Sequence, residues 1–128
     1  LAPLLRKAAL RYPSITLFGP RQSGKTTLAK TCFPDYAYAN LEHLATRELA
    51  ANDPDAFFRR FAPPVIVDEV QRVPSIVSQI QVMIDEHRDE MGRFVLTGSH
   101  QTKLSETVSQ SLAGRTAMLT LLPFAAMQ

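Results

Sequence analysis

The stretch GPRQSGKT at residues 19–26 decides the fold. It has the spacing G-x-x-x-x-G-K-[ST], and it lies between the apolar run ITLF at 15–18 and a segment with helical character. Glycines in a turn between a strand and a helix let backbone N–H groups approach an anion, beside the positive end of the helix. The stretch therefore predicts a phosphate-binding loop. A glycine-containing turn that carries a lysine by chance is the alternative, and the strand and helix flanks argue against it.

Two side chains of this loop have predicted roles. Lys25 is expected to place its ammonium group on the β- and γ-phosphates of a nucleotide, and the Thr26 hydroxyl to ligate Mg²⁺, which prefers oxygen ligands. The residues expected to contact the nucleotide are Gly19, Pro20, Arg21, Gln22, Ser23, Gly24, Lys25, Thr26 and Thr27.

Composition narrows the class of protein. The 128 residues suit one domain, and since the chain begins with Leu and stops after a predicted strand, we expect a piece of a longer protein. A net charge of +2, with both signs mixed along the chain, neither favours nor excludes a nucleic-acid partner. Without a signal peptide or an apolar run of about 18 residues, a cytoplasmic protein without a membrane partner is expected. Cys32 has no partner for an internal disulfide, and His43, His87 and His100 lack metal-ligand spacing.

Strands alternate with helices along the whole chain, which predicts a three-layer α/β fold whose mostly parallel sheet is covered on both faces. Hydrophobic periodicity and the positions of Pro and Gly predict helices at 1–11, 25–32, 41–51, 55–61, 76–87 and 103–112. Strands are expected at 15–18, 36–40, 65–67, 94–97 and 116–121. In the helix at 76–87, His87 is expected on the apolar face and Asp85 on the water-facing side.

Polar residues follow three of these strands, at the sheet edge where ligands of parallel sheets bind. Asp68 ends the apolar run VIV and needs a partner for its charge, so it is expected to lie on the Mg²⁺ side. Glu69 is expected to point elsewhere and to orient or deprotonate the water that attacks the γ-phosphate. An exposed acidic turn is the alternative interpretation of this pair.

Two further residues are candidates for catalysis. Ser99 is expected to hydrogen-bond the γ-phosphate or the attacking water, or else to cap the next helix. Arg115, between a helix and a strand, is expected to reach a phosphate of its own chain or of a neighbour, or else to meet the helix carboxyl end.

Four segments together resemble the AAA+-type ATPase domain at the start of a large group of prokaryotic predicted ATPases, in which a separate C-terminal region follows. They are GPRQSGKTTLAK, VIVDEVQRVP, FVLTGSH and SLAGRTAMLTLLPF, and they cover almost the whole chain in order. The resemblance implies an ASCE-type P-loop fold with strand order 5-1-4-3-2. It also implies that Gly19, Gly24, Lys25 and Thr26 form Walker A, that Asp68 and Glu69 form Walker B, that Ser99 is sensor 1 and that Arg115 is an arginine finger.

The sequence departs from the family pattern in three ways. His100 stands where the family often has Gln, so the identity of the γ-phosphate sensor stays open, and Ala125 stands where it often has Ser. The helical lid that usually follows such a core is absent from these residues.

The function expected from these patterns is Mg²⁺-dependent ATP binding and hydrolysis by a nucleotide switch. Two alternatives stay open: a small-molecule kinase, whose acceptor segment would lie at 41–60, and an ATP-sensing module with negligible hydrolysis. Adenine is implied by the resemblance alone. The expected partners are ATP and a C-terminal region of a longer chain, while a homo-oligomer and a nucleic-acid partner are left open.

Overall fold

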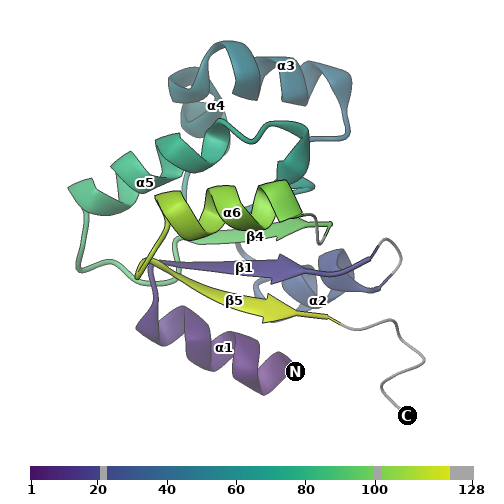
Figure 1. The fold of residues 1–128 in the computed structure, drawn as a ribbon, viewed down its shortest axis with the longest axis vertical. Helices are drawn as coiled ribbons and strands as arrows, with labels where there is room; N and C mark the ends of the chain where they lie inside the picture. Colours follow the sequence, from purple (N-terminus) through teal and green to yellow (C-terminus); the bar gives the residue numbers. More distant parts are fainter. Residues whose placement is uncertain (21–22, 100–101, 122–128) are drawn as a thin grey trace.

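A parallel sheet forms the centre of the molecule. In the computed structural model, which describes residues 1–20, 23–99 and 102–121, five strands form one sheet in the order β2-β3-β4-β1-β5. Neighbouring strands are parallel throughout, and Figure 1 shows β1 between β4 and β5. The predicted order is confirmed. The strands are β1 (Ser14–Phe18), β2 (Ala37–Asn40), β3 (Val65–Asp68), β4 (Phe94–Gly98) and β5 (Thr116–Thr120).

Helices cover both faces of the sheet (Figure 1). One face is packed by α1 (Ala2–Arg11) and α2 (Lys25–Cys32). The other is packed by α3 (Leu44–Asn52), α4 (Pro54–Arg60), α5 (Ile76–Glu86) and α6 (Thr102–Ser111). A short 3-10 helix, η1 (Val70–Arg72), follows β3. Among the described residues, no helix combines the length and the apolar character needed to cross a membrane.

The side-chain alternation of β3 explains why this strand is apolar throughout. Val65 and Val67 belong to the core on the α3 to α6 side, whereas Ile66 belongs to the core on the α1 and α2 side. Successive side chains of a strand point to opposite faces, so a strand that is covered twice needs an apolar residue at every position. The predicted three-layer α/β fold is confirmed.

The segment after β2 departs from the prediction, because α3 begins at Leu44 rather than at residue 41. Leu41 is fully buried and its N–H donates to the Asp68 carbonyl at 3.1 Å, which extends the pairing of β2 with β3. The Glu42 N–H donates to Oδ1 of Asn40 at 3.0 Å, a local turn that competes with helix formation. The first three residues of the predicted helix, 41–43, are therefore not helical despite their composition.

Helix ends account for the other differences. Asp53 caps α4 by accepting a hydrogen bond from the Ala56 N–H at 3.1 Å, and Pro54 is the first helical residue, as predicted. In contrast, α5 ends at Glu86, so His87 does not lie on the apolar face. The His87 side chain is 54% exposed, and its Nδ1 is 3.4 Å from Oε2 of Glu90. The prediction for His87 was wrong because the helix stops one residue earlier.

Candidate nucleotide-binding site

The loop at 19–26 has backbone features that require its glycines. A Cβ on Gly19 would lie 2.7 Å from the Leu121 carbonyl oxygen and 3.0 Å from Oγ of Ser23, so the chain passes too closely for a side chain. Gly24 has φ of 87°, in the left-handed region that favours glycine, and it is the N-cap residue of α2. The loop therefore joins β1 to the amino end of α2 as the motif predicted.

Lys25 is 4% exposed, and its ammonium group turns back onto the loop. Nζ donates to the carbonyl oxygens of Gly19 at 3.0 Å and Pro20 at 2.9 Å. These two bonds leave one of the three ammonium donors for an anion. Ser23 is 5% exposed, and within the described ranges its buried hydroxyl has no hydrogen-bond partner. A phosphate oxygen in the loop would satisfy both groups, so these residues fit a nucleotide.

Asp68 is 4% exposed and accepts hydrogen bonds from hydroxyl groups on three separate elements. Thr26, on α2, lies 3.0 Å from both carboxylate oxygens. Tyr38, on β2, donates to Oδ2 at 2.5 Å, and Thr97, on β4, donates to Oδ1. A hydroxyl beside a carboxylate is a set of hard oxygen donors of the kind that Mg²⁺ prefers. Thr26 and Asp68 therefore fit the predicted magnesium side of the site.

Tyr38 and Thr97 were missed by the sequence analysis. Burial raises the pKa of Tyr38, and its hydrogen bond to Asp68 raises that pKa further, so Tyr38 stays a donor at neutral pH. The Lys30 ammonium lies 3.8 Å from the centre of the Tyr38 ring. Only the register of the sheet brings these hydroxyls to Asp68, because β3 lies between β2 and β4.

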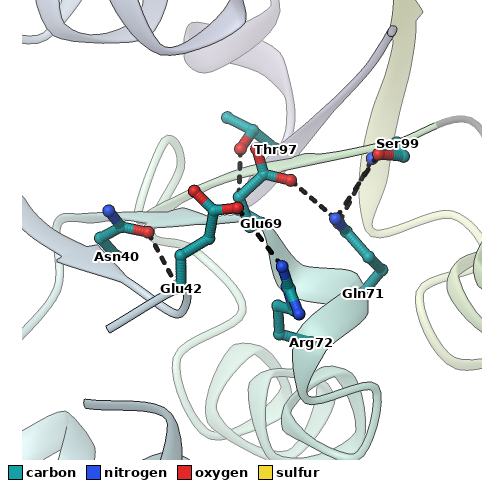
Figure 2. Close-up of polar contacts among 7 residues, drawn as sticks. All are labelled: Asn40, Glu42, Glu69, Gln71, Arg72, Thr97 and Ser99. Carbon is teal, nitrogen blue, oxygen red and sulfur yellow. Dashed lines mark hydrogen bonds and ion pairs between the residues drawn. The ribbon is translucent and has the colours of Figure 1, made fainter. Parts of the chain in front are cut away.

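The Glu69 carboxylate has a hydrogen-bond partner outside the hydroxyl cluster around Asp68. Its backbone has φ of 62° and ψ of 52°, a left-handed conformation that is unusual for a residue other than glycine. The Glu69 N–H donates to Oγ1 of Thr97 at 3.0 Å, and its carboxylate accepts from Nε2 of Gln71 at 2.7 Å (Figure 2). The two neighbouring carboxylates thus have different partners.

Ser99 follows β4, so it lies between the strand of the phosphate loop and the strand of Asp68. Its N–H donates to Oε1 of Gln71 at 3.3 Å. The alternative of a helix cap is not favoured, since α6 begins at Thr102 and Ser99 does not directly precede it. The structure therefore brings Ser99 to the edge of the sheet that holds Glu69.

Arg115 lies at the opposite edge of the sheet. The Ser14 N–H donates to the Arg115 carbonyl at 3.2 Å, and Ser14 begins β1, whereas the phosphate loop follows its last residue, Phe18. Five residues of strand separate the two ends by about 16 Å. A role for Arg115 at the phosphates of its own chain is thus not supported. Its guanidinium also donates to the Ala113 carbonyl at 3.1 Å, as the helix-end alternative expected.

The side chain of Arg115 forms a two-fold ion pair with Asp85. Nε is 2.8 Å from Oδ1, and the second guanidinium bond to Oδ2 is 3.2 Å long. The hydrogen bond from Arg115 lowers the pKa of Asp85, and the same bond raises the pKa of Arg115. Asp85 lies on the water-facing side of α5, as predicted, with its side chain 34% exposed, but the turn at Gly114, with φ of 74°, also brings Arg115 to it.

The remaining predicted residues have the following places. Thr27 is exposed in the first turn of α2. Arg21, Gln22 and His100 lie outside the described residues, as does Ala125. The structure gathers Gly19, Ser23, Gly24, Lys25, Thr26, Asp68, Glu69 and Ser99 at the carboxyl ends of β1, β3 and β4.

A glycine-rich loop before α2 and a hydroxyl-bound carboxylate after β3 define the class of P-loop nucleotide-binding domains. The chain belongs to the AAA domain family, whose model matches residues 11–128. It is an AAA+-type P-loop ATPase domain.

Two curated proteins and one solved structure are similar to this chain. Uncharacterized protein Rv2008c of Mycobacterium tuberculosis and Uncharacterized protein Mb2031c of Mycobacterium bovis are each 34% identical to the chain over 124 residues. The match covers 94% of this chain, which spans 27% of the length of each relative. Domain III of the replication initiation protein DnaA from Thermotoga maritima matches with a TM-score of 0.50 and 22% identity, over 92% of this chain and 59% of that chain. That likeness concerns the fold alone.

Proposed function

We propose that this domain binds ATP together with Mg²⁺ and hydrolyses it, and that the bound nucleotide switches the loop around Ser99. One observation carries the proposal. The Thr26 hydroxyl, in the first turn after the phosphate loop, lies 3.0 Å from both oxygens of the buried Asp68 carboxylate. This contact joins a phosphate-binding element to a metal-binding group from a different strand.

Nucleotide binding would exchange partners within the loop. Lys25 now donates to neutral carbonyl oxygens, and a triphosphate would offer its ammonium group charged acceptors, which form stronger hydrogen bonds. The unpartnered Ser23 hydroxyl would donate to the same phosphates. Thr26 and Asp68 would hold Mg²⁺, which would neutralise charge on the β- and γ-phosphates.

Hydrolysis needs a base for the attacking water. The water oxygen forms a bond to the γ-phosphorus, the bond from that phosphorus to the bridging oxygen breaks, and ADP leaves. Glu69 would accept the proton of the water, since its carboxylate is hydrogen-bonded to Gln71 beside Ser99 (Figure 2) and not used by the hydroxyl groups that bind Asp68. Ser99 follows β4, the strand between β1 and β3, and would donate a hydrogen bond to the γ-phosphate.

The experiment measures nucleotide binding and phosphate release separately, with ATP and GTP, with and without Mg²⁺. Lys25→Ala should abolish nucleotide binding, whereas Glu69→Gln should retain ATP and lose hydrolysis. Lys7→Ala, on the exposed side of α1, is the matched control and should behave like the parent. Unchanged hydrolysis in Glu69→Gln would show that Glu69 is misassigned. ATP loss that requires an acceptor would favour a kinase, and tight binding without turnover would favour a sensing module.

Arg115 is proposed to act on a nucleotide held by a second copy of the chain, because in its own chain it lies at the far edge of the sheet. Its ion pair with Asp85 would have to open first. Mixing inactive Lys25→Ala with inactive Arg115→Ala tests this, since one partner supplies the arginine and the other an intact loop. Recovery of activity is expected, and its absence at every mixing ratio would remove the proposal.

The domain is further proposed to work as part of longer proteins. It spans 27% of the length of the relatives that it matches. The remaining part of such a protein is the proposed recipient of the nucleotide signal.

A further inference from the structure

The side chain of Gln71 connects the two catalytic candidates Glu69 and Ser99. Its Nε2 donates to Oε1 of Glu69 at 2.7 Å, and its Oε1 accepts the Ser99 N–H at 3.3 Å. Nε2 also lies 3.5 Å from Oγ of Ser99. Figure 2 shows the amide of Gln71 between the two residues. None of the roles inferred above involves this side chain.

The chemistry of the two partners explains why an amide stands at position 71. The Glu69 carboxylate only accepts hydrogen bonds, and the Ser99 N–H only donates, so the bridging group must offer one donor and one acceptor. A carboxylate at position 71 could not donate to Glu69, and an apolar side chain could do neither. The same requirement fixes which end of the amide is nitrogen.

Neighbouring residues leave room for the bridge. A Cβ on Gly98 would lie 3.0 Å from Oε1 of Gln71 and 2.8 Å from a methyl carbon of Leu104. Gly98 precedes Ser99, so the strand can approach the amide only because this residue has no side chain. The left-handed backbone of Glu69 in turn starts η1, the turn that carries Gln71.

Two hydrogen-bonded connections therefore join Glu69 to β4 and to Ser99, the residue that follows this strand. Its N–H is bonded to Thr97 at 3.0 Å, and its carboxylate is joined to Ser99 through Gln71. The first bond fixes the backbone, and the second restrains the side-chain rotamers. A long acidic side chain without the second bond would sample several rotamers.

We propose that Gln71 is a positioning residue that sets the direction of the Glu69 carboxylate and couples it to Ser99. The proposal rests on the proposed function, in which Glu69 receives the proton of the attacking water. A displacement of Ser99 by a γ-phosphate would reach Glu69 through a single amide group. Among the described residues, the hydrogen bonds of the Gln71 side chain go to Glu69 and Ser99 and not to Lys25, Thr26 or Asp68, so its loss should affect kcat and leave nucleotide affinity unchanged.

The kinetic test compares Gln71→Met with Gln79→Met. Gln79 also donates to a carboxylate, Asp55, at 3.1 Å, but it does so in an exposed contact between α5 and α4, so it controls for the loss of such a bond. Gln71→Met should lower kcat about 10- to 100-fold, the usual cost of a misaligned catalytic group. Its KM and its affinity for nucleotide should match the parent, as should all three values for Gln79→Met. A parent-like kcat in Gln71→Met, while Glu69→Gln is inactive, would overturn the inference and leave the proposed function intact.

A second measurement, by NMR, does not depend on catalysis. It tests the coupling even if the parent releases no phosphate, a result that would refute the proposed function and not the coupling. Glu69→Ala should shift the backbone amide resonance of Ser99 in an NMR spectrum of the labelled protein. That shift should disappear when the same change is made in the Gln71→Met background, because the connection is already broken. An equal shift in both backgrounds would overturn the coupling.

Discussion

Thr97→Val should be strongly destabilising although it changes little volume. Thr97 is fully buried, and its hydroxyl accepts from the Glu69 N–H at 3.0 Å while it donates to the Asp68 carboxylate. A hydrogen bond to a charged group contributes about 1.5–3 kcal/mol, and one between neutral groups about 0.5–1.5 kcal/mol. Valine removes both and leaves a buried N–H without an acceptor. We expect a loss of about 2–4 kcal/mol in the free energy of unfolding.

Urea denaturation of the purified protein measures this loss. With a slope of about 1–3 kcal/mol per molar urea, the midpoint should fall by at least about 0.7 M and the slope should not change. Thr16→Val is the matched control, because Thr16 is 1% exposed in the adjacent strand β1. Within the part of the chain that the structure describes, its hydroxyl bonds the neutral hydroxyl of Thr116 alone, at 2.9 Å, so about 1 kcal/mol should be lost. Equal losses in the two variants would refute the reasoning.

Three further predictions concern single side chains. Glu69→Gly should be more stable than Glu69→Ala by about 1 kcal/mol in urea, because φ of 62° penalises any Cβ, whereas at Arg72 the alanine variant should be the more stable. Asp85→Asn should destabilise the protein at neutral pH. Because Arg115 depresses the pKa of Asp85, the difference from the parent should persist above about pH 4 and shrink below it, and unfolding at several pH values measures this. Tyr38→Phe should weaken Mg²⁺-dependent ATP binding about 10-fold and spare Mg²⁺-free binding, as calorimetry would detect. Equal Mg²⁺ dependence in Tyr38→Phe and the parent would contradict the positioning of Asp68 by this hydroxyl.

Local sequence signals were sufficient for much of the fold. The apolar run at 65–67 indicated a strand buried on both faces, the flanks of the loop at 19–26 favoured a phosphate-binding loop over a chance turn, and the strand order followed from the family resemblance. The start of α3 could not be predicted from local sequence. Its high helix propensity at residue 41 competes with a bond from Leu41 to Asp68, a partner that local sequence does not reveal.

The site was predictable where its residues follow one another along the chain. Lys25 with Thr26 and Asp68 with Glu69 belong to compact motifs, whereas Tyr38 and Thr97 reach Asp68 only through the register of three strands. Gln71 stands two residues after Glu69 in the sequence. Its role, however, depends on its hydrogen bond with Ser99 and on the absence of a side chain at Gly98. Arg115 has the position that the family resemblance assigns to an arginine finger, yet the parallel arrangement carries it to the far edge of the sheet.

The central place of β1 has a consequence for how the protein is made. Its neighbours are β4 and β5, and Thr16 bonds with a residue 100 positions later in the chain. A ribosome must therefore deliver the chain as far as β4, at residues 94–98, before the first strand acquires either neighbour. Until then both edges of the nascent β1 lack hydrogen-bonding partners. Unpaired strand edges of this kind are prone to aggregate, which favours the binding of chaperones to the partly synthesised chain. Because the proposed nucleotide site needs a loop supported by that strand, a nucleotide would not assist the early steps of folding and would only stabilise the folded domain.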